Sequence, residues 1–97
     1  MLHILASAAL NPIMVERIAA GSAVLLQQNS VWALRPGHQD FVCLEALLAK
    51  SCQVYVLLDD LKLSGLSELS LPASVQAIDY AGWVALTVEH EVIKTWH

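Results

Sequence analysis

Charged side chains are scarce in this chain, and basic ones are scarcer than acidic ones. Only 14% of the 97 residues are charged, and five Lys and Arg stand against nine Asp and Glu, where about 25% charged residues is usual. Nucleic-acid binding needs a basic patch that displaces counterions from phosphate, so we expect no direct contact with RNA or DNA. No uninterrupted apolar run approaches the roughly 20 residues that span a bilayer, so we expect no membrane insertion.

The motifs of common active sites are missing as well. The four histidines are spread along the chain and have no metal-ligand spacing with either cysteine. No glycine-rich phosphate loop follows the apolar runs at 2–6 and 23–26, which disfavours a nucleotide or flavin site, and there is no serine elbow. The sequence therefore predicts no metal, no cofactor and no catalytic residue of a known motif.

Only two cysteines are present, Cys43 and Cys52, and they form no Cys-x-x-Cys pair. They do not suggest a disulfide framework, and the first ten residues lack the basic start of a signal peptide, so we expect a cytoplasmic location. A reactive thiol needs an exposed, electropositive setting. Cys43 has no such setting in the sequence, and Cys52 has one only if its strand start is open to water. Ordinary packing is favoured for both, and Cys52 is kept as a weak catalytic candidate.

What the chain has in abundance is apolar side chains. Hydrophobic residues make up 57% of it, against about 45–50% in a typical soluble protein, and this surplus indicates a subunit that contacts a partner. Of the three tryptophans, Trp83 lies at helical spacing and is predicted to be in the core. Trp32 and Trp96 are interface candidates, although docking of the tail onto its own domain explains Trp96 equally well.

Strand-like and helix-like segments alternate along the chain. Apolar runs predict strands at 2–6, 23–26, 54–58 and 75–78. Helical spacing and capping residues predict helices near 13–19, 38–50, 59–64 and 79–90. We interpret 28–30 as a polar turn, 31–34 as a further short apolar piece and 67–73 as a loop. The alternation predicts an α/β fold: a small single domain, residues 1–97, with a parallel-type sheet and helices on its faces.

Polar residues mark several of the expected helix starts. Asn11 followed by Pro12 is typical of an N-cap with proline in the first helical position, and Asp79 can cap the last helix. Asp59 and Asp60 follow a predicted strand, at the carboxyl edge of the sheet where open α/β folds place ligands. Paired carboxylates could do acid–base work there, but helix capping is the favoured interpretation.

Several short blocks of the chain match one family in order and spacing. They are Met1-Leu2-His3 at the start, Leu-Leu-Gln-Gln-Asn-Ser-Val at 25–31, Val-Tyr-Val-Leu at 54–57 with Asp60-Leu61 and Gly65-Leu66, Ile-Asp-Tyr-Ala-Gly-Trp-Val-x-Leu-Thr at 78–87, and Trp96. Together they resemble the TusB/DsrH family, whose strand-and-turn element is usually written Leu-Leu-x-Gln-Asp-Gly-Val. Ser30 stands where that turn usually has glycine, which points to a different turn geometry.

The resemblance implies a DsrE/F/H-like fold and a heterohexamer with two copies of each of three related subunits. The partners would be TusC- and TusD-like chains. That complex would accept persulfide sulfur from TusA and pass it through a TusD cysteine towards TusE, for 2-thiolation of the tRNA wobble uridine. DsrH-type members carry a cysteine in the first helix, where this chain has Met14. This difference favours the Tus branch, in which the subunit is thought to be non-catalytic, over a DsrEFH-like role in sulfur oxidation.

Two further hypotheses stay open at this point. One is a sulfurtransferase that uses Cys52 or Cys43 itself. The other is a stand-alone homo-oligomeric binding module that uses the strand ends near Asp59. The non-catalytic sulfur-relay subunit is favoured over both, and the binding module comes next.

Overall fold

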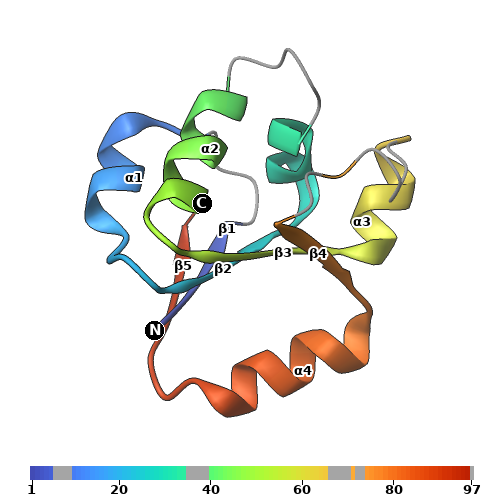
Figure 1. Ribbon diagram of the computed structural model, residues 1–97. Helices are drawn as coiled ribbons and strands as arrows, with labels where there is room; N and C mark the ends of the chain where they lie inside the picture. Colours follow the sequence, from blue (N-terminus) through green and yellow to red (C-terminus); the bar gives the residue numbers. More distant parts are fainter. Residues whose placement is uncertain (6–9, 35–39, 66–70, 72–73, 97) are drawn as a thin grey trace.

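A five-stranded parallel sheet organises the molecule. The computed structural model describes residues 1–5, 10–34, 40–65, 71 and 74–96. Within them the strand order is β4-β3-β2-β1-β5 (Figure 1), and all pairs of neighbouring strands are parallel. The strands are β1 (Leu2–Leu5), β2 (Ala23–Leu26), β3 (Gln53–Leu57), β4 (Val75–Ile78) and β5 (Ile93–Trp96). The predicted α/β class is confirmed.

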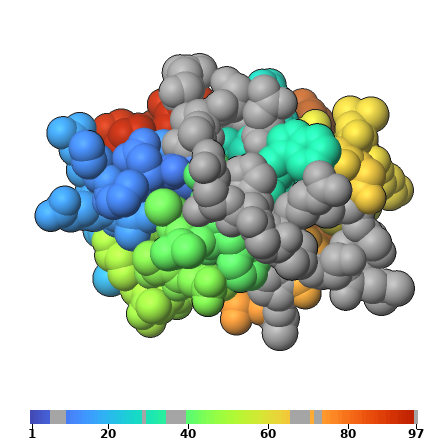
Figure 2. Space-filling view, turned by 90° about the horizontal axis from the view of Figure 1, so that it is seen from above, coloured from blue at the N-terminus to red at the C-terminus, as the bar shows by residue number. Residues whose placement is uncertain are grey.

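Helices cover both faces of this sheet unequally. They are α1 (Pro12–Arg17), the 3-10 helix η1 (Gln28–Leu34), α2 (Phe41–Ala49), α3 (Leu58–Leu63) and α4 (Tyr80–Glu89). Figure 1 shows α4 alone on one face of the sheet, and Figure 2 shows α1, α2, η1 and α3 together on the opposite face. The chain steps from β1 to β4 in one direction and then returns through α4 to β5 at the far edge. Since parallel crossovers are right-handed, the reversed step places α4 on the other face.

The core lies in two layers, one on each side of β1 and β2, which are buried at every residue. The larger cluster lies under α1, α2 and η1 and includes Leu5, Leu26 and Leu44. The smaller cluster lies under α4 and includes Leu25 and Leu86, with Trp83 packed against it. Trp83 is therefore at the core as predicted, although its side chain is only half-buried.

Local hydrogen bonds start two of the helices as the sequence predicts. The Asn11 side chain accepts a hydrogen bond from Met14 N at 2.9 Å, and Pro12 occupies the first helical position. The Asp79 side chain accepts one from Gly82 N at 2.9 Å. A Cβ on Gly82 would lie 3.0 Å from Ile78 Cβ, so glycine lets α4 start close to the end of β4.

Two segments differ from the sequence prediction. Residues 28–34 form one continuous 3-10 helix instead of a polar turn followed by an apolar piece, and it buries Ser30, Val31 and Leu34. The tail, for which the sequence predicts no element, forms β5 and pairs with β1 from end to end. The predicted loop at 67–73 lies outside the described residues except for Leu71.

Candidate functional site

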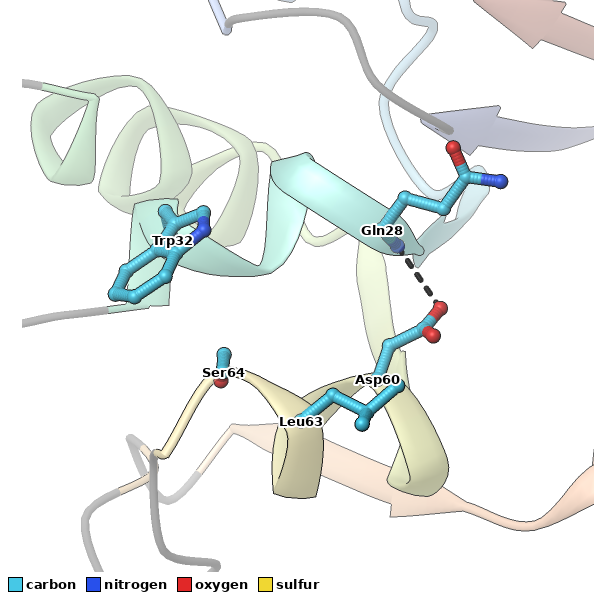
Figure 3. Close-up of a pocket in the computed structure, with 5 residues that line it drawn as sticks. All are labelled: Gln28, Trp32, Asp60, Leu63 and Ser64. Carbon is cyan, nitrogen blue, oxygen red and sulfur yellow. Dashed lines mark hydrogen bonds between the residues drawn. The ribbon is translucent and has the colours of Figure 1, made fainter.

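A pocket of about 370 Å³ opens at the carboxyl edge of the sheet. It lies between η1, which follows β2, and α3, which follows β3. Because β2 and β3 are parallel neighbours, the segments that follow them emerge at the same edge. The lining residues are Gln28, Trp32, Asp60, Leu63 and Ser64 (Figure 3). The pocket is thus where α/β folds commonly bind ligands, as the sequence anticipated for this strand end.

Asp60 connects the two walls of this pocket. Its Oδ2 accepts a hydrogen bond from the backbone N–H of Gln28 at 2.8 Å, across 32 positions of sequence (Figure 3). Gln28 opens η1 and has a φ of +52°, a left-handed conformation that side chains other than glycine adopt uncommonly. The carboxylate therefore caps η1 and holds its strained first residue in place.

This contact corrects the interpretation of the two aspartates as caps of their own helix. The N-cap of α3 is Leu57, which makes no side-chain capping hydrogen bond, while Asp59 and Asp60 lie in the first helical turn. Two carboxylates in that turn still favour the helix through its dipole. Only Asp60 lines the pocket. Asp59 is exposed, so the aspartates do not form a paired acid–base site in it.

The remaining pocket walls combine apolar and neutral polar side chains. Trp32 is half-exposed and Leu63 is 85% exposed. Ser64 Oγ donates to the carbonyl of Leu61 at 2.6 Å, which directs the hydroxyl to the helix end. A stacking surface, an apolar side chain and one carboxylate suit the binding of a peptide segment or a small molecule. Among the described residues that line this pocket there is no His or Cys, so those residues offer no Cys–His or Ser–His pair.

Both cysteines are at least partly shielded from solvent. Cys52 is 6% exposed, packs in the larger core cluster, and its Sγ lies 3.7 Å from the carbonyl oxygen of Ala19. Cys43 is half-buried on α2, and burial followed by the negative charge of Asp40 raises the pKa of its thiol. At this exposure the Cys52 thiol is largely shielded from water, although Cys52 also lines a pocket of about 230 Å³ with Gln53 and Tyr55. A catalytic role for Cys52 stays a prediction.

The third tryptophan is tied into the chain itself. Trp96 Nε1 donates to His3 Nδ1 at 3.1 Å, and the ammonium of Lys94 lies 4.1 Å from the centroid of the Trp96 ring. A Nδ1 that accepts leaves the imidazole neutral with its proton on Nε2, and that buried nitrogen has no partner among the described residues. Burial, then Lys94, then the N-terminal amine lower the pKa of His3.

Within the described part of the chain, no three His, Cys, Asp or Glu side chains come together in a group that could hold a metal ion. Over the same residues, no helix is both long enough and apolar enough to cross a bilayer. Lys50 instead uses its charge inside the fold: its ammonium donates to the carbonyls of Val15 and Ile18 at the end of α1, the former at 2.6 Å. That contact joins α2 to α1.

Comparison with known sequences gives one consistent family. A family model described as "DsrH like protein" matches residues 7–93. A curated relative called Protein TusB, from Pectobacterium parmentieri, is 32% identical over 99% of this chain and 100% of its own length. Another Protein TusB, from Photorhabdus laumondii, is 33% identical over 81% of this chain and 79% of its own.

Comparison with solved structures gives the same fold at lower identity. The ychN protein from E. coli superposes with a TM-score of 0.77 at 17% identity, covering 98% of this chain and 97% of the other. A protein of unknown function from Methanobacterium thermoautotrophicum superposes with a TM-score of 0.74 at 13% identity, covering 98% and 96%. At these identities the likeness shows the fold alone.

Proposed function

The chain belongs to the DsrH-like family of sulfur-relay proteins, and we propose that it is a non-catalytic subunit of a TusBCD-like complex. That complex supports 2-thiolation of the wobble uridine of tRNA in the cytoplasm. The observation that carries the proposal is the similarity to Protein TusB along 99% of this chain. The proposed partners are TusC- and TusD-like chains, two copies of each with two of this one, and indirectly TusA and TusE.

The environment of the two thiols supports the non-catalytic part of the proposal. Persulfide chemistry starts from a thiolate that a sulfur donor can reach. Cys52 is packed in the core, and burial together with the negative charge of Asp40 raises the pKa of Cys43, which disfavours its thiolate. The reactive cysteine is therefore assigned to a partner subunit. This chain contributes surface and position, since thiol exchange depends on access and orientation.

Trp32 is the residue we assign to contact with another subunit. It lies half-exposed on η1 and lines the pocket at the carboxyl edge, which is also lined by Leu63, whose side chain is 85% exposed. A large aromatic and an exposed leucine in the walls of one pocket offer the kind of anchor that dominates many interfaces. Trp96 stays a predicted interface residue of lower rank, because its indole N–H is already used by His3.

Deletion of this chain tests the proposal in cells that otherwise modify their tRNA normally. Wobble 2-thiouridine, measured by mass spectrometry of digested tRNA, is expected to disappear on deletion and to return with the wild-type chain. An affinity-tagged copy is expected to bring down TusC- and TusD-like chains in equal amounts. Normal 2-thiouridine after complete deletion would refute the assignment.

Trp32→Ala is the matching test of the proposed anchor. The variant is expected to fold, because a half-exposed side chain is removed, and to lose most of the co-purifying partner. Val42→Ala is the control, since Val42 is 70% exposed on α2, outside the pocket. If Trp32→Ala recovers as much partner as the wild-type chain, Trp32 is not an interface residue. That result would leave the sulfur-relay assignment unchanged.

A second candidate, a stand-alone binding module, is favoured by the position of the pocket at the carboxyl edge. It predicts that a ligand raises the melting temperature of the isolated chain and that Asp60→Ala abolishes the shift. A DsrEFH-like role in sulfur oxidation is the other branch of the family. It predicts normal 2-thiouridine and impaired sulfur oxidation on deletion.

A further inference from the structure

The pocket at the carboxyl edge of the sheet carries one charge among its described lining residues. That charge is the carboxylate of Asp60, and the other lining residues are neutral, namely Gln28, Trp32, Leu63 and Ser64. No described Lys, Arg or His lines the pocket, so the carboxylate has no cation beside it there. The chain as a whole carries a net charge of −4. The electrostatics of this pocket therefore favour a cationic occupant.

The carboxylate of Asp60 keeps acceptor sites for such an occupant. Its Oδ2 accepts the hydrogen bond from Gln28 N at 2.8 Å (Figure 3), and its Oδ1 has no hydrogen-bond partner among the described residues. An ionised carboxylate only accepts hydrogen bonds and has about four lone-pair sites. The bond from Gln28 N uses one of them and fixes the position of the group in the pocket wall. Asp60 is therefore a preorganised acceptor with unused capacity.

The hydroxyl in the pocket wall also presents an acceptor. Ser64 Oγ donates its proton to the carbonyl of Leu61 at 2.6 Å, so its oxygen can only accept a hydrogen bond from a ligand. The Gln28 side chain is exposed and leads away from Trp32 (Figure 3). An occupant that satisfies both Asp60 and Ser64 is thus a donor with several N–H groups. A guanidinium group is such a donor, because it carries five N–H groups in a planar fork.

The apolar part of the pocket suits the rest of an arginine side chain. Trp32 is half-exposed and Leu63 is 85% exposed. Arginine lays its aliphatic stem along apolar surface and stacks its guanidinium on aromatic rings, whereas the lysine ammonium is a compact, strongly hydrated point charge. The pocket volume of about 370 Å³ is at the low end of the range of about 300–1,000 Å³ for ligand sites. That size suits one side chain.

We infer that this pocket receives an arginine side chain of a partner subunit, with the guanidinium on Asp60 and the stem along Trp32 and Leu63. The partner is a chain of the complex proposed above, so this assignment rests on the proposed function. A small guanidinium compound would leave Leu63 exposed to water, whereas a protein that carries the arginine covers it as well. Arginine and tryptophan are both enriched where interfaces hold most of their binding energy.

Matched charge variants test the contact. Asp60→Asn removes the charge but keeps a carbonyl oxygen that can accept from Gln28 N, so the variant is expected to fold. Asp59→Asn is the control, because it changes the net charge equally at an exposed residue that does not line the pocket. Isothermal titration calorimetry measures the affinity of the full-length chain for the purified pair of TusC- and TusD-like chains. Circular dichroism melts check the fold of both variants.

The two variants are expected to differ clearly in affinity. Asp60→Asn is expected to raise the dissociation constant at least about tenfold, because it leaves the guanidinium in the interface without its counter-charge. Asp59→Asn is expected to raise it less than about threefold, as for a charge at the surface. Equal affinities for the two variants would overturn the arginine contact and leave the relay assignment intact. If the wild-type chain itself does not bind the pair, the proposed function fails together with the contact.

A free guanidinium probe tests the pocket in the wild-type chain, without any substitution. Nα-acetylarginine amide is titrated into the isotopically labelled full-length chain, and the uncharged citrulline analogue is the control. Nuclear magnetic resonance is expected to show shifts of the Gln28 backbone N–H and the Trp32 indole N–H at millimolar probe, with none for the citrulline analogue. Absence of shifts with the arginine probe would overturn the guanidinium site. Binding of the free probe at low micromolar concentration would make the pocket a small-molecule site and overturn the partner assignment.

Chemical modification of arginine identifies the residue on the partner. Phenylglyoxal labels accessible arginines of the TusC- and TusD-like pair, and mass spectrometry locates the labels. One partner arginine is expected to be protected by the wild-type chain and to be labelled again when Asp60→Asn replaces it. If the wild-type chain binds the pair and protects no arginine, the contact is wrong, while the measured binding still supports the relay complex.

Discussion

Removal of the Asp60 carboxylate tests how the pocket at the carboxyl edge is held together. In the wild-type chain this group accepts a hydrogen bond from Gln28 N at 2.8 Å and joins α3 to the start of η1. Asp60→Ala deletes the acceptor and leaves the surrounding apolar packing unchanged. Gln28 then keeps its unfavourable φ of +52° without the contact that fixes it.

The size of the effect follows from the kind of bond and its exposure. Replacement of a capping carboxylate by alanine costs about 0.5–2 kcal/mol, and a hydrogen bond to a charged group lies in the upper part of such ranges. This bond is at the surface, where water can replace the lost acceptor, so we expect about 1 kcal/mol. For a chain of this size that corresponds to a fall in melting temperature of about 4–8 °C.

Urea unfolding followed by circular dichroism gives the free energy, and Asp59→Ala is the matched control. Asp59 is the adjacent aspartate, in the same turn of α3 but exposed, so its removal is expected to cost less than about 0.5 kcal/mol. Gln28→Gly in the Asp60→Ala background is expected to recover part of the loss, because glycine adopts the positive φ freely. Equal losses for the two aspartates would refute the bridging role of Asp60.

Three further perturbations test other contacts. The pKa of His3 is lowered in the folded chain from 6.5, so the unfolded chain binds its proton more readily. The contribution of neutral His3 to the free energy of unfolding is present above about pH 6.5 and is lost as the pH falls through the folded pKa. Urea unfolding from pH 7.5 to 5 measures this loss, and His3→Gln is expected to make the free energy of unfolding depend less on pH. Lys50→Met removes the donors to the end of α1 and is expected to lower the free energy of unfolding by about 1–2 kcal/mol. The control Arg17→Met, at an exposed position, is expected to cost almost nothing. A similar loss in both variants would show that the Lys50 hydrogen bonds do not stabilise the fold. Cys43 is expected to react slowly with iodoacetamide at pH 7.5, and Asp40→Asn is expected to speed the reaction by lowering the pKa that Asp40 helps to raise; an unchanged rate would show that Asp40 has no such effect.

The elements that the sequence predicts well are those fixed by neighbours in the chain. Asn11 and Asp79 each cap a helix by bonding to a backbone N–H three residues ahead, so a short window contains the whole interaction. Strands β1 and β2 can also be recognised from their apolar runs, because strands buried on both faces have no alternation of polar and apolar residues.

The features that were missed depend on partners far along the chain. Asp60 and Gln28 are 32 positions apart, and nothing local links them, so the cap of η1 could not be predicted. Strand β5 is Ile-Lys-Thr-Trp, with three exposed residues, and forms because β1 offers it a backbone edge. The near-complete burial of Cys52 likewise depends on a distant segment, because its Sγ lies 3.7 Å from the carbonyl oxygen of Ala19.

The central claim is that this chain supports sulfur relay without using its own thiols. The most direct test replaces both Cys43 and Cys52 with serine, in cells that lack the native copy, and measures wobble 2-thiouridine by mass spectrometry. We expect 2-thiouridine at the wild-type level. Loss of 2-thiouridine to the level of the deletion strain, with the variant still folded and still bound to its partners, would contradict it.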